Sequence, residues 1–239
     1  PTSSLTTARS NMTKATTQSN ALAVGGATPT VTAATEAWTQ GVTVPVAGSW
    51  SSGGNMNTPR YFPAGAGTQT AALAFGGQPG SGRTGATESY NGTSWTTSPN
   101  SLNTAVSHAA GFGTQTAAIN TGGINTAVSN VTTTESWNGT SWTTVNAMNT
   151  ARSALAGAGL QSGGLGFGGD RYPNPPTAAT ELWNGTSWTT SPTSLANARY
   201  NIGGCGSQTL GLACGGTPAT TSTEEWTGTA LAIRTITSS

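Results

Sequence analysis

The chain has 239 residues, of which 6% are charged, and its formal net charge is +1. An ordinary soluble domain carries about 25% charged residues, and this chain has no cluster of lysine or arginine. Nucleic acid and anionic membrane surfaces are therefore not expected as partners. The longest apolar runs, such as Ala71–Phe75, have the length of a strand, so no membrane-inserted segment is expected. No apolar stripe occurs at helical spacing, which indicates an all-β protein.

A double glycine is the most regular feature of the sequence. The pairs begin at Gly25, Gly76, Gly122, Gly168 and Gly215, so consecutive pairs are 51, 46, 46 and 47 residues apart. Such a period is typical of repeat architectures. We predict a single domain, residues 1–239, built from five repeats at about 1–52, 53–98, 99–145, 146–191 and 192–239.

Further residues keep the same register in every repeat. Sixteen residues before the first glycine stand Arg9, Arg60, Val106, Arg152 and Arg199. Seven residues before it stand Gln18, Gln69, Gln115, Gln161 and Gln208. After the glycines come a glutamate and an aromatic residue, at Glu36/Trp38, Glu88/Tyr90, Glu135/Trp137, Glu181/Trp183 and Glu224/Trp226.

Each repeat is predicted to form four short strands separated by turn residues. In the fourth repeat their predicted bounds are Arg152–Gly157, Gly164–Phe167, Ala179–Trp183 and Ser187–Thr190. Four-stranded units cannot bury their faces alone, so they must pack blade against blade around an axis. The sequence therefore predicts a closed five-bladed β-propeller with four antiparallel strands per blade.

The phrase TESWNGTSWTT, which starts at Thr134, recurs with one substitution in the second and fourth repeats. Asn-Gly favours a tight hairpin turn, and such a turn would place Trp137 directly opposite Trp142. We predict that these aromatic pairs fill the space between blades rather than serve as stacking platforms for sugars.

The repeat resembles the kelch repeat: an arginine, a strand, a second strand that ends in Gly-Gly, then Glu-x-Trp/Tyr and a second Trp. Met148–Arg152 is similar to the start of the first strand in that family. The resemblance covers the whole chain in five copies and implies structural aromatics and loops that bind partners at one end. The segments NGTSWTT and GTQTAALAFGG, together with the low content of charged residues in the chain, resemble kelch-like repeats in tail-fibre and virion proteins of marine bacteriophages. The layout is also similar to five-bladed lectin propellers, whose residues do not match.

The sequence departs from the kelch pattern in three places. Val106 replaces the arginine of the third repeat, Leu231 stands where the fifth repeat should have its second Trp, and the first repeat has an insertion at Thr39–Ser49. All four strands of each blade are contiguous in the sequence. Closure of the ring is therefore expected to depend on packing between the first and last blades.

The loops between second and third strands vary most between repeats, and they share one end of a propeller. Most charges outside the repeat register lie in them, including Arg83, Asp170 and Arg171, and Tyr172 is the best aromatic candidate for exposure. Because function concentrates on loops held by a rigid scaffold, these four residues are predicted to bind a ligand. The alternative is that they only keep the loops soluble. The insertion Thr39–Ser49 lies at the opposite end and is a possible second contact.

The arginines in register have two interpretations. In kelch adaptors of ubiquitin ligases, arginines at this position line the channel mouth and bind acidic peptides, and the matching residues here are Arg9, Arg60, Arg152 and Arg199. Guanidinium groups suit such carboxylates. The alternative, which we favour, is a partly buried ion pair with the glutamate of the same repeat, since either charge alone would be costly to bury.

Catalytic chemistry has few candidates in this chain. His108 is the single histidine, and most acidic residues belong to the repeat register, so neither an enzyme nor a metal or other cofactor is expected. His108 is predicted in or near the first strand of the third blade. Cys205 and Cys214 are predicted as small buried residues without a disulfide, because hairpin counting does not place them opposite each other.

Two functions follow as hypotheses. The first is a non-enzymatic virion or tail-fibre module that binds a host-surface ligand, a glycan in the version we favour, through the variable loops. The second is a purely structural virion or fibre component that contacts other subunits. Either would act in the virion or outside the cell. Pro1 is not a translation start and no secretion signal follows it, so we expect a processed product or part of a longer chain.

Overall fold

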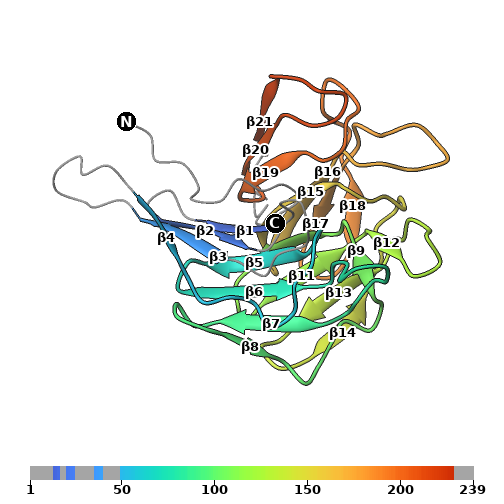
Figure 1. The fold of residues 1–239 in the computed structure, drawn as a ribbon. Coiled ribbons are helices and arrows are strands. Elements are labelled where there is room, and N and C mark those ends of the chain that lie inside the picture. The colour runs from blue at the N-terminus through green and yellow to red at the C-terminus, as the bar shows by residue number, and fades with distance from the viewer. Residues whose placement is uncertain (1–12, 17–19, 25–34, 40–48, 229–239) are drawn as a thin grey trace, which may run out of the picture.

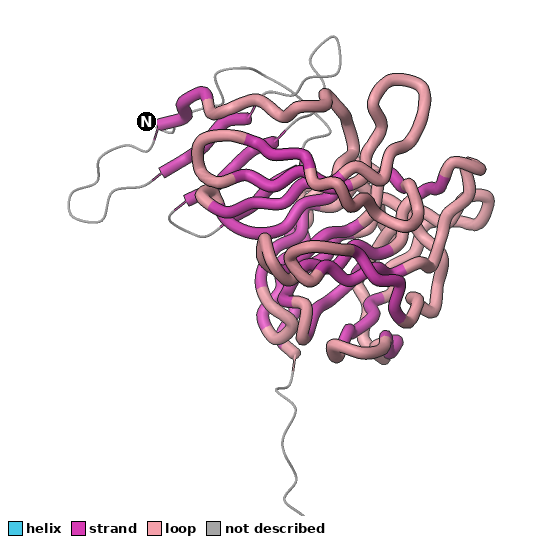
Figure 2. Tube along the Cα trace, turned by 90° about the horizontal axis from the view of Figure 1, so that it is seen from below, coloured by secondary structure: helices cyan, strands magenta, loops and turns pink. Residues whose placement is uncertain are grey.

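Antiparallel sheets follow one another along the chain as the blades of a β-propeller (Figure 1). The structure, a computed structural model, describes residues 13–16, 20–24, 35–39 and 49–228, with side chains from Trp50 to Gly228. These residues form strands and loops without a helix (Figure 2), so none of them forms a helix long and apolar enough to span a membrane. The predicted all-β propeller is confirmed.

Each sheet is formed by consecutive strands of one repeat. The first contains β1 (Thr13–Thr16), β2 (Asn20–Val24), β3 (Thr35–Thr39) and β4 (Ser49–Ser52). The second contains β5 (Ala64–Thr68), β6 (Ala71–Phe75), β7 (Thr87–Tyr90) and β8 (Trp95–Thr97). The third contains β10 (Ala110–Gly113), β11 (Ala118–Thr121), β13 (Thr134–Trp137) and β14 (Trp142–Val145), beside the short pair β9 (Val106–Ser107) and β12 (Ile124–Asn125). The fourth contains β15 (Ala156–Leu160), β16 (Gly163–Phe167), β17 (Thr180–Trp183) and β18 (Trp188–Thr190), and the last contains β19 (Gly203–Gly206), β20 (Leu210–Cys214) and β21 (Thr223–Thr227).

The number of complete blades differs from the prediction of five. Four four-stranded sheets form, and the last repeat contributes three strands within the described residues. The innermost strands pack in chain order, β1 on β5, β5 on β10, β10 on β15 and β15 on β19. Comparable packing of β19 on β1 is absent among the described residues. The predicted closure by packing of the last blade on the first is therefore not seen there.

The aromatic pairs lie where the hairpin turn predicts them. Trp137 pairs with Trp142, and their ring centroids are 5.3 Å apart. The Trp142 ring also reaches the preceding blade, where its Nε1 donates a hydrogen bond of 2.8 Å to Thr87 Oγ1. Both rings are buried. Aromatic packing between blades, as predicted, thus forms much of the core.

The glutamines in register connect neighbouring blades. Gln115 donates from Nε2 to the backbone oxygens of Ala72 and Tyr90 in the preceding blade, at 3.0 and 2.6 Å. Gln161 and Gln208 make the corresponding bonds to the backbone oxygens of Trp137 and Trp183. This explains why glutamine recurs at the turn between first and second strands.

The first strand of the fourth blade starts later than predicted, at Ala156 rather than Arg152. The side chain of Arg152 turns into the blade, and Ala154 has a positive φ of 51°. An extended strand cannot pass through that conformation. The other three predicted strands of this repeat match the observed ones within one residue.

The two cysteines are not buried as predicted. Cys214 is exposed and Cys205 is half-buried, and both thiols are free. Cys205 pairs with Leu212 and Cys214 with Gly203, so the two do not face each other across the hairpin. The corresponding positions of the fourth blade are buried because β19 and β20 cover them, whereas no described sheet covers the last blade in this way.

Candidate binding face

The loops between second and third strands lie at one end of the propeller, beside the segments that lead into each first strand. In the second blade Tyr61, before β5, pairs with Gln78, after β6. The last blade repeats this with Tyr200 and Thr217. We call the end formed by residues 78–86, 124–133, 170–179 and 217–222 the variable end; its segment with β12 protrudes at the right of Figure 1.

The arginines in register are buried inside the blades behind this end. Arg60, Arg152 and Arg199 are 0%, 0% and 2% exposed. Arg152 Nη2 lies 3.0 Å from Glu181 Oε1, Arg199 Nη2 lies 2.7 Å from Glu224 Oε1, and Arg60 pairs with Glu88 in the same way. The favoured ion pairs are thus present in these three repeats. Arg9 lies outside the described residues.

Each arginine also donates hydrogen bonds to a backbone oxygen of its double glycine and to one of the variable loop or its end. Arg152 Nη1 donates to the backbone oxygens of Gly168 and Ala179, at 3.0 and 2.6 Å. Burial lowers the pKa of Arg152 to about 10 and also lowers that of Arg60, although the neighbouring glutamate raises each. The guanidinium group of Arg152 therefore stays charged at neutral pH and holds the double glycine and the variable loop together.

The third repeat lacks this cation because Val106 takes the place of the arginine. Glu135 is nevertheless fully buried, and its carboxylate accepts backbone hydrogen bonds from Asn103 at 2.7 Å and Thr104 at 2.9 Å. Burial raises the pKa of the Glu135 carboxyl, and these hydrogen bonds oppose the rise. The third blade thus carries a buried acid without the ion pair of its neighbours.

Arg83 is the first predicted ligand-binding residue, and it is partly engaged by the protein. Its Nε donates a hydrogen bond of 3.0 Å to Ser107 Oγ in the next blade, and Ser107 Oγ lies 3.0 Å from Nδ1 of His108. The His108 ring stacks on Phe62 with centroids 3.6 Å apart. Burial, and then the charge of Arg83, lowers the pKa of His108 to about 4. His108 lies between β9 and β10, as predicted, and is neutral at pH 7.

Asp170, Arg171 and Tyr172 lie together in the loop of the fourth blade. The backbone of Asp170 pairs with Ser153, and Arg171 Nε donates to the backbone oxygen of Pro175 at 3.1 Å. Tyr172 is 80% exposed, which leaves its ring free for a ligand. No hydrogen bond or ion pair joins Arg83 to these three residues within the described chain. The predicted residues thus occupy one end of the propeller as two separate groups.

A pocket at the variable end of the last blade was missed by the sequence analysis. Its cavity of about 310 Å³ is lined by Asn197, Ala198, Arg199, Pro218, Ala219, Thr220 and Ser222. Thr220 Oγ1 donates to Ser222 Oγ at 2.8 Å, so the Ser222 hydroxyl keeps its own proton for another acceptor. Small residues and neutral polar groups therefore line the pocket, together with Arg199, whose charge is neutralised by Glu224.

Loop length is the sequence signal that could have revealed this pocket. Glu224 follows Gly215 by nine residues, whereas Glu181 follows Gly168 by 13. The last variable loop is therefore shorter than its neighbours. Fewer residues then cover the space above Arg199.

Two further points of the sequence analysis concern a metal site and the insertion in the first repeat. No group of three or more potential metal ligands occurs in the part of the chain that the structure describes. Residues 40–48, which form most of the insertion predicted as a second contact, lie outside the described residues.

The fold has a clear counterpart among solved structures, although the sequence has none among known families. No protein-family model and no curated protein matches the chain. The structure is similar to the propeller protein YjhT, with a TM-score of 0.73 and 14% sequence identity, over 89% of this chain and 74% of that chain. At this identity the likeness shows the fold alone, an all-β propeller.

Proposed function

We propose that this chain is a kelch-type propeller module of a virion or tail fibre, which binds a host-surface glycan at the variable end without catalysing a reaction. The observation that carries this proposal is the pocket of about 310 Å³ beside Ser222. Small-molecule sites are typically clefts of about 300–1,000 Å³ with a few convergent polar groups. A pocket of this size accommodates a sugar unit.

The chemistry of the pocket favours a neutral ligand. The charge of Arg199 is already neutralised by Glu224, so an anionic ligand gains little from it. Asn197, Thr220 and Ser222 offer amide and hydroxyl groups that match sugar hydroxyls as donors and acceptors. The exposed ring of Tyr172 in the neighbouring loop offers an aromatic face for a longer glycan.

The alternative is a purely structural virion or fibre part whose partners are other subunits. Such a part would favour an apolar ring at one end of the propeller. The large exposed apolar residues are instead divided between the ends, with Val128 and Tyr172 in variable loops and Leu160 and Leu210 at the opposite turns. This distribution favours the binding module. In either case we propose a virion or extracellular location.

A glycan array tests the proposal directly. We expect the domain to bind a neutral glycan, and titration of that glycan at about 50 mM and 500 mM salt should give similar dissociation constants, because neutral hydrogen bonds are little screened. A folded domain that binds no glycan on the array would contradict the proposal and favour the structural alternative. A dissociation constant that rises steeply with salt would contradict the assignment of a neutral ligand.

A further inference from the structure

The repeat arginines show which oxygen atoms of a blade bind a cation. Arg152 Nη1 donates to the backbone oxygens of Gly168 and Ala179, at 3.0 and 2.6 Å. Its Nη2 donates to Glu181 Oε1 at 3.0 Å. The other two described arginines bind the same three positions of their own blades. Each of these blades therefore has one place where two backbone oxygens and a carboxylate oxygen surround a positive charge.

The third blade keeps this arrangement of backbone oxygens although Val106 replaces the arginine. The N–H group of Gly122 donates to the backbone oxygen of Thr133 at 3.0 Å. In the fourth blade Gly168 donates to Ala179 in the same way, at 3.1 Å. Among the described residues, no donor reaches the backbone oxygen of Gly122, and no second donor reaches that of Thr133. Both oxygens thus lack the partner that the guanidinium group supplies in the other blades.

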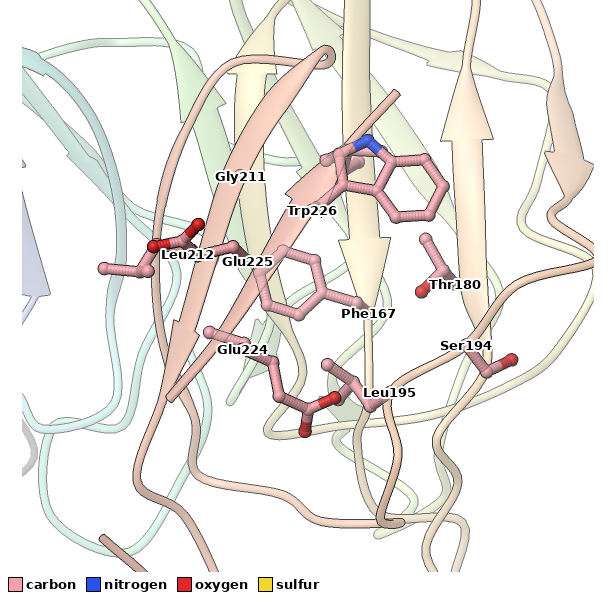
Figure 3. A pocket seen from close by; sticks show the side chains of 11 residues that line it. Phe167, Thr180, Ser194, Leu195, Gly211, Leu212, Glu224, Glu225 and Trp226 are labelled. Carbon is pink, nitrogen blue, oxygen red and sulfur yellow. The ribbon is translucent and has the colours of Figure 1, made fainter. Parts of the chain in front are cut away.

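The carboxylate of Glu135 is also held as in the other blades. Its Oε2 and Oε1 accept from the backbone N–H groups of Asn103 and Thr104, respectively. In the last blade the corresponding segment donates to Oε2 of Glu224, and Figure 3 shows that carboxylate directed towards Leu195 in this segment. The carboxylate of Glu135 is therefore placed to face the position that the guanidinium group takes in the other blades.

Asn120 adds a fourth oxygen atom. It pairs directly with Glu135 across the sheet, so the two side chains project from the same face. In the blades with a described arginine, the residue opposite the glutamate is small: Ala74, Gly166 or Ala213. Asn120 is 1% exposed, and its Oδ1 is buried without a hydrogen-bond partner. A polar side chain thus stands opposite the glutamate in the blade where valine replaces the arginine.

These four oxygens determine which ligand fits. All are acceptors, and the carboxylate brings a buried negative charge that is costly without a counter-charge. A water molecule has too few protons for four acceptors and carries no charge. Ca²⁺ prefers 6–8 oxygen ligands, and with a single carboxylate it would leave a buried positive charge. A monovalent cation balances the charge and suits carbonyl and carboxylate oxygens.

We propose that the third blade binds a small monovalent cation, such as potassium or ammonium, between Glu135, Asn120 and the backbone oxygens of Gly122 and Thr133. The cation takes the place of the guanidinium group and joins the double glycine to the variable loop of this blade. Ammonium can donate the same N–H···O hydrogen bonds as guanidinium. The site lies inside the blade, is separate from the pocket beside Ser222 and does not depend on the glycan proposal.

Thermal unfolding of the 239-residue chain in choline chloride at pH 7 provides the test. Potassium, ammonium or sodium replaces choline at constant ionic strength, so general screening of charges is unchanged. Choline is too large for the site. We expect at least one of the three ions to raise Tm saturably, by about 3–6 °C at ten times its dissociation constant. Changes in NMR amide shifts during the titration should be largest around Gly122 and Thr133.

Two matched variants locate the response in the third blade. Glu135→Gln removes the negative charge and should abolish the rise in Tm. Glu181→Gln is the same substitution in the fourth blade and should keep it. The proposal is overturned if Tm is the same in all four chlorides, which is the result expected if a water molecule or the amide of Asn120 satisfies Glu135. It is equally overturned if Glu135→Gln keeps the response or Glu181→Gln loses it.

A double variant supplies the cation from the chain itself. Val106→Arg combined with Asn120→Ala gives the third blade the residues that the second blade has at these positions, Arg60 and Ala74. Its own guanidinium group should then occupy the site, so the response to all three ions should disappear. A saturable response that persists in this folded variant would also overturn the proposal.

Discussion

The buried arginine–glutamate pairs allow a sharp test, because the third repeat provides a natural control. Glu181→Gln keeps the shape of the side chain but leaves the buried guanidinium of Arg152 without a counter-charge. Removing one partner of a buried ion pair typically costs about 3–5 kcal/mol. We expect a loss of this size in the free energy of unfolding at pH 7.

Glu135→Gln is the matched substitution in a blade without the arginine. The backbone N–H groups of Asn103 and Thr104 donate to different carboxylate oxygens, so the single amide oxygen of the glutamine can keep one of these hydrogen bonds and the other is lost, but no buried cation is left uncompensated. We expect a loss of about 1–3 kcal/mol at pH 7, smaller than the loss in Glu181→Gln. The difference between the two variants, rather than either value alone, measures the contribution of the buried pair.

The pH dependence separates the two variants further. Burial raises the pKa of Glu135 above its unfolded value, so the folded state binds more protons than the unfolded state between these two pKa values. Stability from this group is therefore fully present below the unfolded pKa and falls as pH rises through the folded pKa. Glu135→Gln should remove this fall.

Urea unfolding monitored by tryptophan fluorescence provides the measurement, with m-values compared between variants to show that the same transition is followed. Equal losses for Glu181→Gln and Glu135→Gln at pH 7 would refute the reasoning. A steeper fall of stability with rising pH in Glu135→Gln would refute the assignment of the raised pKa.

Two further predictions concern packing and titration. Gly111→Ala should destabilise the protein by about 1–3 kcal/mol in urea unfolding, because an added Cβ would lie 2.8 Å from the backbone of the neighbouring blade. Gly82→Ala is the control: its added Cβ meets nothing within 4 Å, so stability should change by less than about 0.5 kcal/mol. His108 should titrate near pH 4 in NMR, and Arg83→Gln should raise that pKa because a nearby positive charge is removed. Stability from neutral His108 is present above its unfolded pKa of about 6.5 and is lost as pH falls towards 4. A His108 titration near pH 6.5 would contradict its burial.

Much of the fold could be predicted because the repeat carries its information locally. The Asn-Gly turn determines which residues face each other, and the pairing of Trp137 with Trp142 followed from counting alone. The Arg–Glu pair followed from the cost of burying a lone charge, and Arg152 and Glu181 are paired. Local signals of this kind do not depend on how the blades are assembled.

The predictions were wrong or incomplete where burial, strand bounds or pockets depend on neighbouring blades or on the conformation of the loops. Cys214 occupies a position that is buried in the second, third and fourth blades, but no described sheet covers the last blade. The start of β15 at Ala156 depends on the positive φ of Ala154, which an alanine does not signal. The pocket beside Ser222 depends on a short loop, and counting loop lengths against the other repeats would have indicated it. The number of complete blades was wrong because the period was counted without evidence for the last strand.

The most direct measurement of the central claim is glycan titration of three forms of the chain. The unmodified chain is compared with Ser222→Ala, which changes the pocket at the variable end, and with Ser94→Ala, which changes an exposed turn at the opposite end. We expect the glycan selected on the array to bind Ser94→Ala as tightly as the unmodified chain and Ser222→Ala at least several-fold more weakly. Unchanged binding by Ser222→Ala, or a loss confined to Ser94→Ala, would contradict a binding site in this pocket.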